Sequence, residues 1–239
     1  MNRYYLPPSQ WTDSCLTLPE DEARHCAQVL RQREGDEIEI FDGEGRSARC
    51  LIEVVSKKQV RCQVREVSRD EAPSRKIQLL QSIPKGKNME WIIQKAVELG
   101  VSEIVPLQTD HSVVLAKTES DRLKKLEKWQ RVALEACKQC GQNFLVKIHP
   151  IGKLSDRVTT ITEVKLVGSL QPGAVPLREK VRSFPPSCEI ALAVGPEGDF
   201  SDREYAELAE AGFAPVSLGP LVLRVETASF VLLTAASLF

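Results

Sequence analysis

The 239-residue chain lacks the features that mark several common classes of protein. It has no apolar run long enough to cross a membrane, and its first ten residues are polar and proline-rich, unlike a secretory signal. Its seven cysteines are an odd number and are scattered, which argues against a disulfide framework. We therefore expect a cytoplasmic protein of one or two domains that does not associate with membranes.

Cofactor and metal motifs are also scarce. The chain contains neither a G-x-G-x-x-G dinucleotide motif nor a phosphate-binding P-loop. The three histidines, at positions 25, 111 and 149, are too dispersed to indicate a metal triad. Cys137 and Cys140 form a C-x-x-C pair with no second pair near it, which favours helix packing over zinc or redox chemistry. No metal is expected.

The net charge of −1 excludes a uniformly basic nucleic-acid-binding protein. The basic residues are nevertheless concentrated in the middle of the chain, where residues 75–147 hold 13 Lys and Arg against 8 Asp and Glu. Residues 1–72 and 148–239 each carry a net charge of −3. The middle of the chain could hold an RNA backbone, and a solvated helix face is the alternative explanation.

The last fifty or so residues carry the strongest local pattern. The apolar run Ile190–Val194 is typical of a strand buried on both faces, and it stops at a tight turn formed by Gly195–Gly198. Ser201 and Glu204 have the spacing of a capping box, so a helix should begin there. The expected continuation is a helix end at Gly212, a strand over 216–218, a turn at 219–220 and a helix over 226–238. Glycine turns after neighbouring strands are where α/β folds bind ligands, although ordinary strand-to-helix turns look the same.

Residues 1–72 are expected to form a small β domain. Alternation of polar and apolar residues predicts strands over 37–41, 48–55 and 59–67, with a hairpin turn at 42–45. A short helix is predicted over 20–30, with Ala23, Cys26, Ala27 and Leu30 on one face. The polar segment 70–74 is interrupted by proline, which places the domain boundary there and gives domains 1–72 and 73–239.

The second domain begins with a pattern of strand, helix and strand that indicates a parallel βαβ unit and an α/β fold. The expected elements are a strand over 77–83, a helix over 88–99, and a strand over 104–107. Asn88 is the expected N-cap of that helix and Gly100 its C-terminal stop. A long helix over 119–140 and a strand over 164–167 follow, and the latter ends at a third glycine turn.

Two motifs near the C-terminus, GPEGDFS at 195–201 and LGPLVLRVETA at 218–228, resemble the paired signatures of the small-subunit ribosomal RNA uridine-N3 methyltransferases. The segments KGKNMEWIIQKAVELGVSEIVPL at 85–107 and HCAQVLRQREGDEIEIFDGEG at 25–45 extend the resemblance over most of the chain. It implies a C-terminal α/β domain of the SPOUT superfamily, with a parallel sheet and a deep trefoil knot, preceded by a PUA-like β-barrel that holds RNA. It also implies S-adenosylmethionine as cofactor, ribosomal RNA or the small ribosomal subunit as partner, and a homodimer.

The resemblance places the cofactor among the three glycine turns, closed by the turn at 223–227. The implied cofactor-binding residues are Gly168, Ser169, Gly195, Pro196, Glu197, Gly198, Leu218, Gly219, Leu223, Arg224 and Thr227. Our candidates for RNA phosphate contacts are Arg3, Arg24, Arg31, Arg33, Lys85 and Lys87. Solvated surface side chains without a ligand are the alternative for this second set.

Arg224 and Glu226 are the candidates for catalysis. Methylation of uridine N3 requires that the N3 proton leaves and that negative charge on the base is tolerated. An arginine could stabilise that charge, and a carboxylate could accept the proton directly or through water. The alternative is an Arg–Glu pair that caps the last helix.

Five positions depart from the family pattern. His111, Gln142 and Leu221 stand where arginine is usual, Val225 replaces a threonine, and Asp199 replaces a glycine, so it must adopt a backbone conformation that glycine adopts freely. The three lost charges keep two alternatives open. One is an enzyme with the same fold and cofactor acting on another RNA nucleotide, and the other is a non-catalytic RNA-binding protein.

Overall fold

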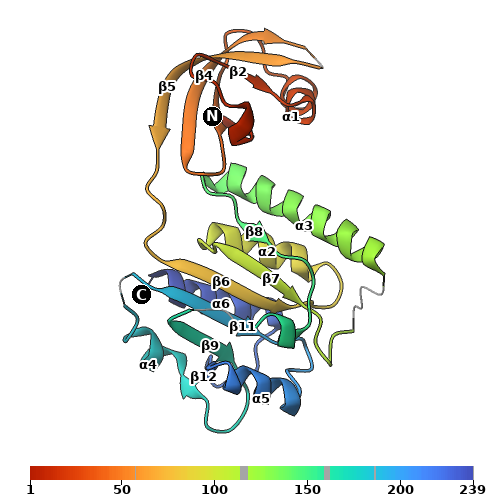
Figure 1. The fold of residues 1–239 in the computed structure, drawn as a ribbon, viewed down its shortest axis with the longest axis vertical. Helices are drawn as coiled ribbons and strands as arrows, with labels where there is room; N and C mark the ends of the chain where they lie inside the picture. Colours follow the sequence, from red (N-terminus) through yellow and green to blue (C-terminus); the bar gives the residue numbers. More distant parts are fainter. Residues whose placement is uncertain (57, 114–117, 159–161, 186, 239) are drawn as a thin grey trace. The chain divides into compact units, whose positions relative to one another are not determined.

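The computed structural model describes residues 1–56, 58–113, 118–158, 162–185 and 187–238 (Figure 1). The chain forms two compact units: one contains Met1–Ala72 and Cys137–Leu145, and the other contains Pro73–Ala136 and Val146–Phe239. These units differ from the expected division at residue 72 in one respect, because the segment Cys137–Leu145 belongs with the first unit. Among the described helices, none combines the length and the apolar character that crossing a membrane would require.

The first unit is built on a five-stranded sheet in the order β1-β3-β4-β5-β2. β1 pairs with β3 in parallel, and the other neighbours are antiparallel. The strands are β1 (Asn2–Tyr5), β2 (Cys15–Leu18), β3 (Glu37–Phe41), β4 (Arg46–Val55) and β5 (Val60–Arg69). The three strands predicted from alternation are confirmed. β1 and β2 were missed because each has four residues and pairs with a strand that is distant in the sequence.

The helix predicted over 20–30 is present in two pieces. α1 (Glu20–Arg24) continues into a π-helical turn over His25–Val29. Ala23 and Cys26 are fully buried as expected, whereas Leu30 is exposed. The wider π-helical turn rotates the following side chains away from the face that an α-helix would present.

The segment Cys137–Leu145 joins the first unit through the hairpin turn between β3 and β4. Leu145 N–H donates to the Gly43 carbonyl at 3.0 Å, and Gly45 N–H donates to the Asn143 carbonyl at 3.1 Å. Both glycines have positive φ, and a Cβ on Gly45 would lie 2.5 Å from the Phe144 ring. The two glycines therefore allow both the turn and the close approach of the later segment.

The second unit contains a seven-stranded sheet in the order β10-β12-β9-β11-β6-β7-β8, in which every pair of neighbours is parallel. Its strands are β6 (Lys76–Ser82), β7 (Glu103–Leu107), β8 (Lys147–Ile148), β9 (Val164–Gly168), β10 (Val175–Pro176), β11 (Glu189–Val194) and β12 (Ala214–Ser217). The helices are α2 (Asn88–Glu98), α3 (Glu119–Cys140), α4 (Leu177–Val181), α5 (Asp202–Glu210) and α6 (Val225–Leu238). All of the elements predicted for this domain are present, with ends shifted by a residue or two.

Helices cover both faces of this sheet. α6 packs against β11 and β6, with α2 beside it (Figure 1). On the opposite face, Ala191 and Ala193 of β11 and Leu80 of β6 share a buried cluster with Leu208 of α5. β11 is therefore buried on both sides, which explains its almost continuous apolar sequence.

The expected helix ends are partly confirmed. Ser201 and Glu204 form a complete capping box, and Gly100 and Gly212 follow their helices with positive φ. The expected cap on α2 is wrong: its N-cap position is Lys87, which makes no side-chain capping bond, and Asn88 is the first helical residue.

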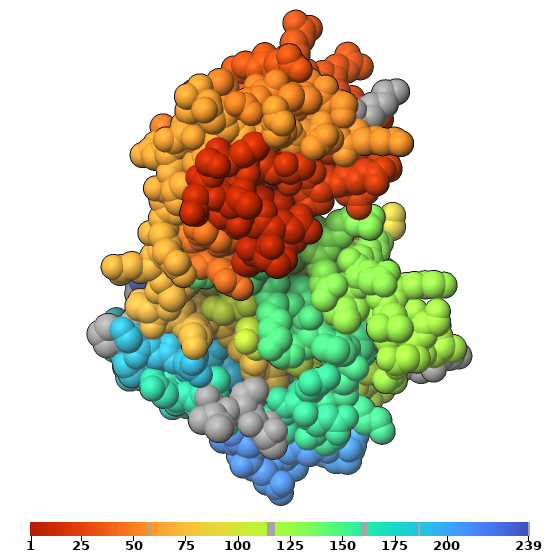
Figure 2. All heavy atoms as spheres, turned by 45° about the horizontal axis from the view of Figure 1, so that its top comes forward, coloured from red at the N-terminus to blue at the C-terminus, as the bar shows by residue number. Residues whose placement is uncertain are grey.

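α3 lies on the molecular surface (Figure 2) with long polar side chains exposed along it.

Candidate functional site

A cavity of about 430 Å³ lies in the second unit, at the carboxyl ends of β9, β11 and β12. The three glycine turns converge on it, and the segment entering α6 completes its wall. This edge of a parallel sheet is the usual ligand-binding edge of α/β folds. The predicted residues that line it are Gly168, Ser169, Gly195, Pro196, Glu197, Leu218, Gly219, Leu223, Arg224 and Glu226.

Two residues predicted to contact the cofactor lie outside the cavity wall. Gly198 turns toward His111, where an added Cβ would lie 3.2 Å from the His111 Cβ. Thr227 is exposed in the first turn of α6. Each of the two directly follows a residue that does line the cavity. A sequence motif therefore could not show which residues of the motif face the cavity and which do not.

Several lining residues were not predicted. They are Asn88, Leu170, Val194, Asp199, Ser217, Leu221, Val222, Val225 and Ala228. Leu221 and Val222 are 73% and 76% exposed, so they place apolar surface at the cavity in contact with solvent. The sequence did contain a signal for these two lining residues, because they are large aliphatic residues that directly follow a Gly-Pro turn. Asn88 gave no such signal, because its position suggested a helix cap.

Asp199 occupies the left-handed region with φ of +61°. This conformation is stabilised by its own side chain, since Oδ1 accepts bonds from Phe200 N–H at 2.8 Å and from the Tyr205 hydroxyl at 2.9 Å. Burial, together with the Asp199 carboxylate, raises the pKa of Tyr205, so this phenol remains a donor. The departure from glycine is therefore accommodated by local hydrogen bonds.

His111 holds the same turn from outside the cavity. Its Nδ1–H is shared between the carbonyl oxygens of Asp199, at 2.9 Å, and Gly198, at 3.0 Å. These carbonyls, with smaller contributions from Glu204 and Asp110, raise the pKa of His111 above its ordinary value of 6.5. A residue that we considered as a lost RNA contact thus stabilises the wall of the cavity.

The raised pKa of His111 predicts a pH dependence of ligand binding in the cavity. The protonated imidazole is favoured by the folded turn, so its contribution is complete below about pH 6.5 and is lost as pH rises through the raised pKa. Because His111 is exposed, we expect ligand affinity to fall by only about two- to fivefold across this window. Calorimetry should show that His111→Ala has the reduced affinity at every pH and therefore no pH dependence in this window. His111→Arg should keep the affinity and lose only the pH dependence, and an unchanged profile in both variants would contradict the prediction.

Glu226 and Arg224 do not form the helix-capping ion pair that was the alternative to a catalytic role. The Glu226 carboxylate, 7% exposed, accepts a bond from Asn88 Nδ2 at 3.3 Å. Among the residues that the structure describes, Arg224 makes no ion pair, and its side chain is exposed at the cavity. Both side chains remain available to a ligand.

The cavity lining fits the S-adenosylmethionine that the resemblance implies. Val194, Leu218 and Leu223 provide apolar surface, and the carboxylates of Glu197 and Glu226 provide negative charge for a cationic ligand. A Cβ on Gly168 would lie 3.3 Å from a Leu232 methyl group, so glycine keeps this part of the wall open. In the described part of the chain, no group of three or more His, Cys, Asp or Glu residues could hold a metal ion.

Arg3 must be withdrawn from the phosphate-binding candidates. Its guanidinium is buried and donates to Glu39, to the Cys137 carbonyl and to Asn143, and it lies 4.6 Å from the centre of the Phe41 ring. Arg3 therefore links β1 to the segment that joins the first unit after α3.

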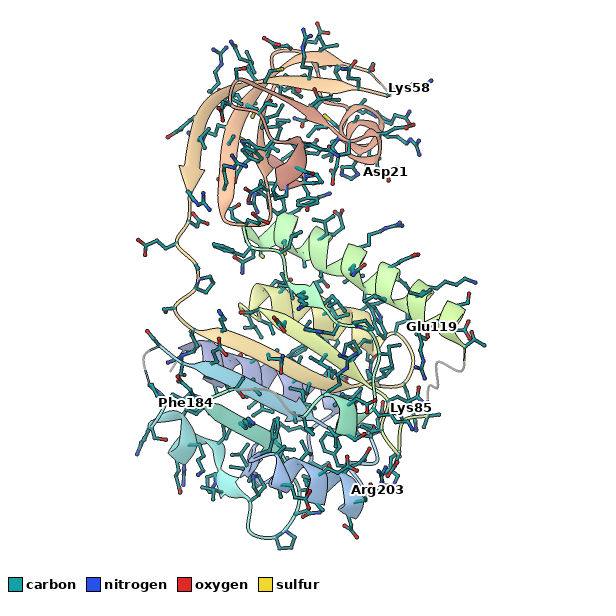
Figure 3. All side chains as sticks on the ribbon, viewed as in Figure 1. Asp21, Lys58, Lys85, Glu119, Phe184 and Arg203 are labelled. Carbon is teal, nitrogen blue, oxygen red and sulfur yellow. The ribbon has the colours of Figure 1, made fainter. Side chains whose placement is uncertain are left out.

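The other candidates for RNA binding are exposed. In the first unit these are Arg24, Arg31 and Arg33, of which Arg31 has φ of +52°. In the second unit, Lys85 and Lys87 lie in the loop between β6 and α2, and Figure 3 shows Lys85 toward the same end of the sheet as Arg203 of α5. Lys85 N–H donates to Glu197 Oε1 at 2.9 Å, which fixes this loop beside the cavity.

Comparison with known proteins matches both units. Residues 70–237 match the model of an RNA methyltransferase domain, and residues 18–65 match that of an RNA methyltransferase PUA domain. The chain is 32% identical to ribosomal RNA small subunit methyltransferase E of Bacillus subtilis, covering 99% of this chain and 96% of that protein. It is 33% identical to the protein of the same name from Aquifex aeolicus, over 89% of this chain and 90% of that one.

Two solved structures are similar over nearly the whole length. One is a methyltransferase from Legionella pneumophila in complex with bound S-adenosylmethionine, with a TM-score of 0.89 and 33% identity over 98% of this chain and 96% of that one. The other is a ribosomal RNA small subunit methyltransferase E from Neisseria gonorrhoeae bound to S-adenosylmethionine, with a TM-score of 0.87 and 32% identity over the same shares. The expected fold class, an α/β domain with a parallel sheet preceded by a PUA-like domain, is confirmed.

Proposed function

Because the chain belongs to the ribosomal RNA small subunit methyltransferase E family, we propose that it methylates N3 of a uridine in small-subunit ribosomal RNA, with S-adenosylmethionine as methyl donor. The likeness to two structures that hold this cofactor supports the choice of donor. A cytoplasmic location fits the proposal, because none of the seven cysteines, all of which lie in the described part of the chain, forms a disulfide.

One observation carries the proposal: Arg224 and Glu226 line the same cavity as the three glycine turns. When bound there, S-adenosylmethionine would supply a methyl group on a positively charged sulfur. Glu226 then accepts the proton that leaves N3 of the uracil, directly or through one water. Arg224 stabilises the negative charge that the base acquires as the proton departs. Glu197 adds negative charge on the side of the cavity next to the loop between β6 and α2.

The decisive experiment is to identify the modified nucleotide. The full-length protein would be incubated with S-adenosylmethionine carrying a labelled methyl group and either free ribosomal RNA or intact small subunits. The expected product is N3-methyluridine at one position, detected by nucleoside mass spectrometry and by a reverse-transcription stop, because the methyl group blocks the Watson–Crick edge. Label on another nucleotide would support the alternative enzyme, and RNA binding without label would support the non-catalytic alternative.

We propose that the two exposed lysines of the loop between β6 and α2 contribute to RNA binding. Lys85→Ala combined with Lys87→Ala should weaken RNA binding and reduce the slope of log K against log salt concentration by about 1 to 2. Cofactor affinity should be unchanged, because the bond to Glu197 comes from the backbone of Lys85. A filter-binding titration at several salt concentrations measures the RNA affinity and its salt slope. The double variant Arg178→Ala plus Lys180→Ala on α4 is the control. A variant that matches the wild-type slope would show that these lysines are only solvated.

We also propose a homodimer formed through α2 and α6. Leu232 and Leu233 are buried within the unit, but Phe230 is only half-buried and packs edge-to-face on Trp91, which is 47% exposed. Such aromatic surface is typical of protein interfaces. Light scattering at micromolar concentration should give twice the monomer mass, and Trp91→Glu should give a monomer. A wild-type protein that is monomeric under these conditions contradicts the proposal.

A further inference from the structure

The carboxylate of Glu226 has one hydrogen-bond partner among the residues that the structure describes. Asn88 Nδ2 donates to its Oε2 at 3.3 Å, whereas Oε1 makes no hydrogen bond to the described protein. Both side chains line the cavity, and Glu226 is otherwise buried. The amide therefore acts on the side chain to which we assign proton removal.

Asn88 is held firmly in this position. It is the first residue of α2, and Met89 and Ile92 in the following turn are buried in the core. On its other side, the bond from Lys85 N–H to Glu197 Oε1 fixes the preceding loop. Because Asn88 is the first helical residue and not the N-cap, its amide is not needed for capping, and it reaches across to α6.

The chemical character of this partner suits a carboxylate that must take up a proton. A lysine or arginine in the same place would stabilise the charged carboxylate strongly and make it a poorer base. The structure shows no ion pair to Glu226 in its described part, and the neutral amide of Asn88 orients one carboxylate oxygen without placing a positive charge beside it. The other oxygen is left free for the substrate.

We propose that Asn88 is a positioning residue that orients the carboxylate of Glu226 toward the N3 proton of the target uracil. This inference rests on the proposed role of Glu226. It adds a residue of α2, outside the C-terminal motifs, to the groups that determine turnover.

Single substitutions test the amide donor. Asn88→Ala removes it, and Asn88→Asp replaces it with a carboxylate of nearly the same shape. We expect kcat to fall about tenfold for Asn88→Ala, the effect of one hydrogen bond to a charged group, and further for Asn88→Asp, because two carboxylates repel. Cofactor affinity and KM for RNA should stay within about twofold of wild type. Gln130→Ala removes an exposed amide from α3, outside the cavity, and should leave all three values unchanged.

A double-mutant cycle separates positioning from general support of the fold. Once Glu226→Gln has removed the base, adding Asn88→Ala should lower kcat no further, because both substitutions disable one unit. The double variant Asn88→Asp with Glu226→Gln places the amide on α6 and the carboxylate on α2. It therefore restores a hydrogen bond in which the donor and the acceptor have changed places. We expect it to recover the unfolding temperature lost by Asn88→Asp alone, while kcat stays low.

The outcomes distinguish this inference from the function on which it rests. If Glu226→Gln keeps full turnover, the assigned role of Glu226 falls, and that of Asn88 falls with it. If Glu226→Gln is inactive while Asn88→Ala has a normal kcat, only the inference about Asn88 is overturned. Additive losses in the cycle, or a kcat that follows the unfolding temperature in every variant, would also overturn it.

Discussion

Replacing Arg224 with alanine is expected to lower kcat roughly a hundredfold or more, the usual scale for one group that stabilises developing charge. The Arg224 side chain is exposed at the cavity and makes no ion pair in the described part of the chain, so its removal should leave the fold intact. RNA affinity should change little, because we assign the phosphate contacts to the first unit and to the loop between β6 and α2. Single-turnover kinetics with saturating RNA and cofactor measure the effect.

Arg178→Ala is the matched control for this prediction. Arg178 is an exposed arginine of α4, in the same unit but outside the cavity, so kcat should be that of the wild type. If Arg224→Ala turns over normally, charge on the base is stabilised by other groups. If it instead weakens RNA binding with kcat intact, Arg224 is a binding residue.

The second large effect is expected from Gly195→Val, which should weaken S-adenosylmethionine binding by about tenfold to a hundredfold. A Cβ on Gly195 would lie 3.2 Å from Asp199 Oδ1, from the Phe200 ring and from Phe200 N. Valine therefore displaces the turn that forms part of the cavity wall. Overpacking of this kind costs about 1–3 kcal/mol, and each 1.4 kcal/mol is about a factor of ten in affinity.

Calorimetric titration with S-adenosylmethionine measures this loss. Circular dichroism and RNA binding should remain close to wild type, because the first unit has its own sheet and core. Retention of cofactor affinity in Gly195→Val would remove the glycine turns from the binding site. Loss of RNA binding together with cofactor binding would instead indicate that the substitution disrupts the whole fold.

The sequence by itself determined the longer elements of the second unit and their order, whereas the short elements β8, β10 and α4 were not predicted. The apolar run before Gly195 and the capping box at Ser201 and Glu204 depend on neighbouring residues, so their patterns predicted a buried strand and a helix start correctly. The positive φ of Asp199 was likewise predictable, because the position is one where glycine is usual. The convergence of the glycine turns followed from the parallel arrangement, since the carboxyl ends of such strands meet at one edge.

Only the tertiary structure decided what the individual polar side chains do. The buried side chain of Arg3 hydrogen-bonds to Asn143, and the exposed side chain of His111 to the Asp199 carbonyl. The side chain of Asn88 hydrogen-bonds to Glu226. Each of these partners is more than eighty residues away along the chain. A local pattern reports periodicity and turn chemistry, whereas a hydrogen bond depends on which distant segments the packing of the sheet brings within about 3 Å.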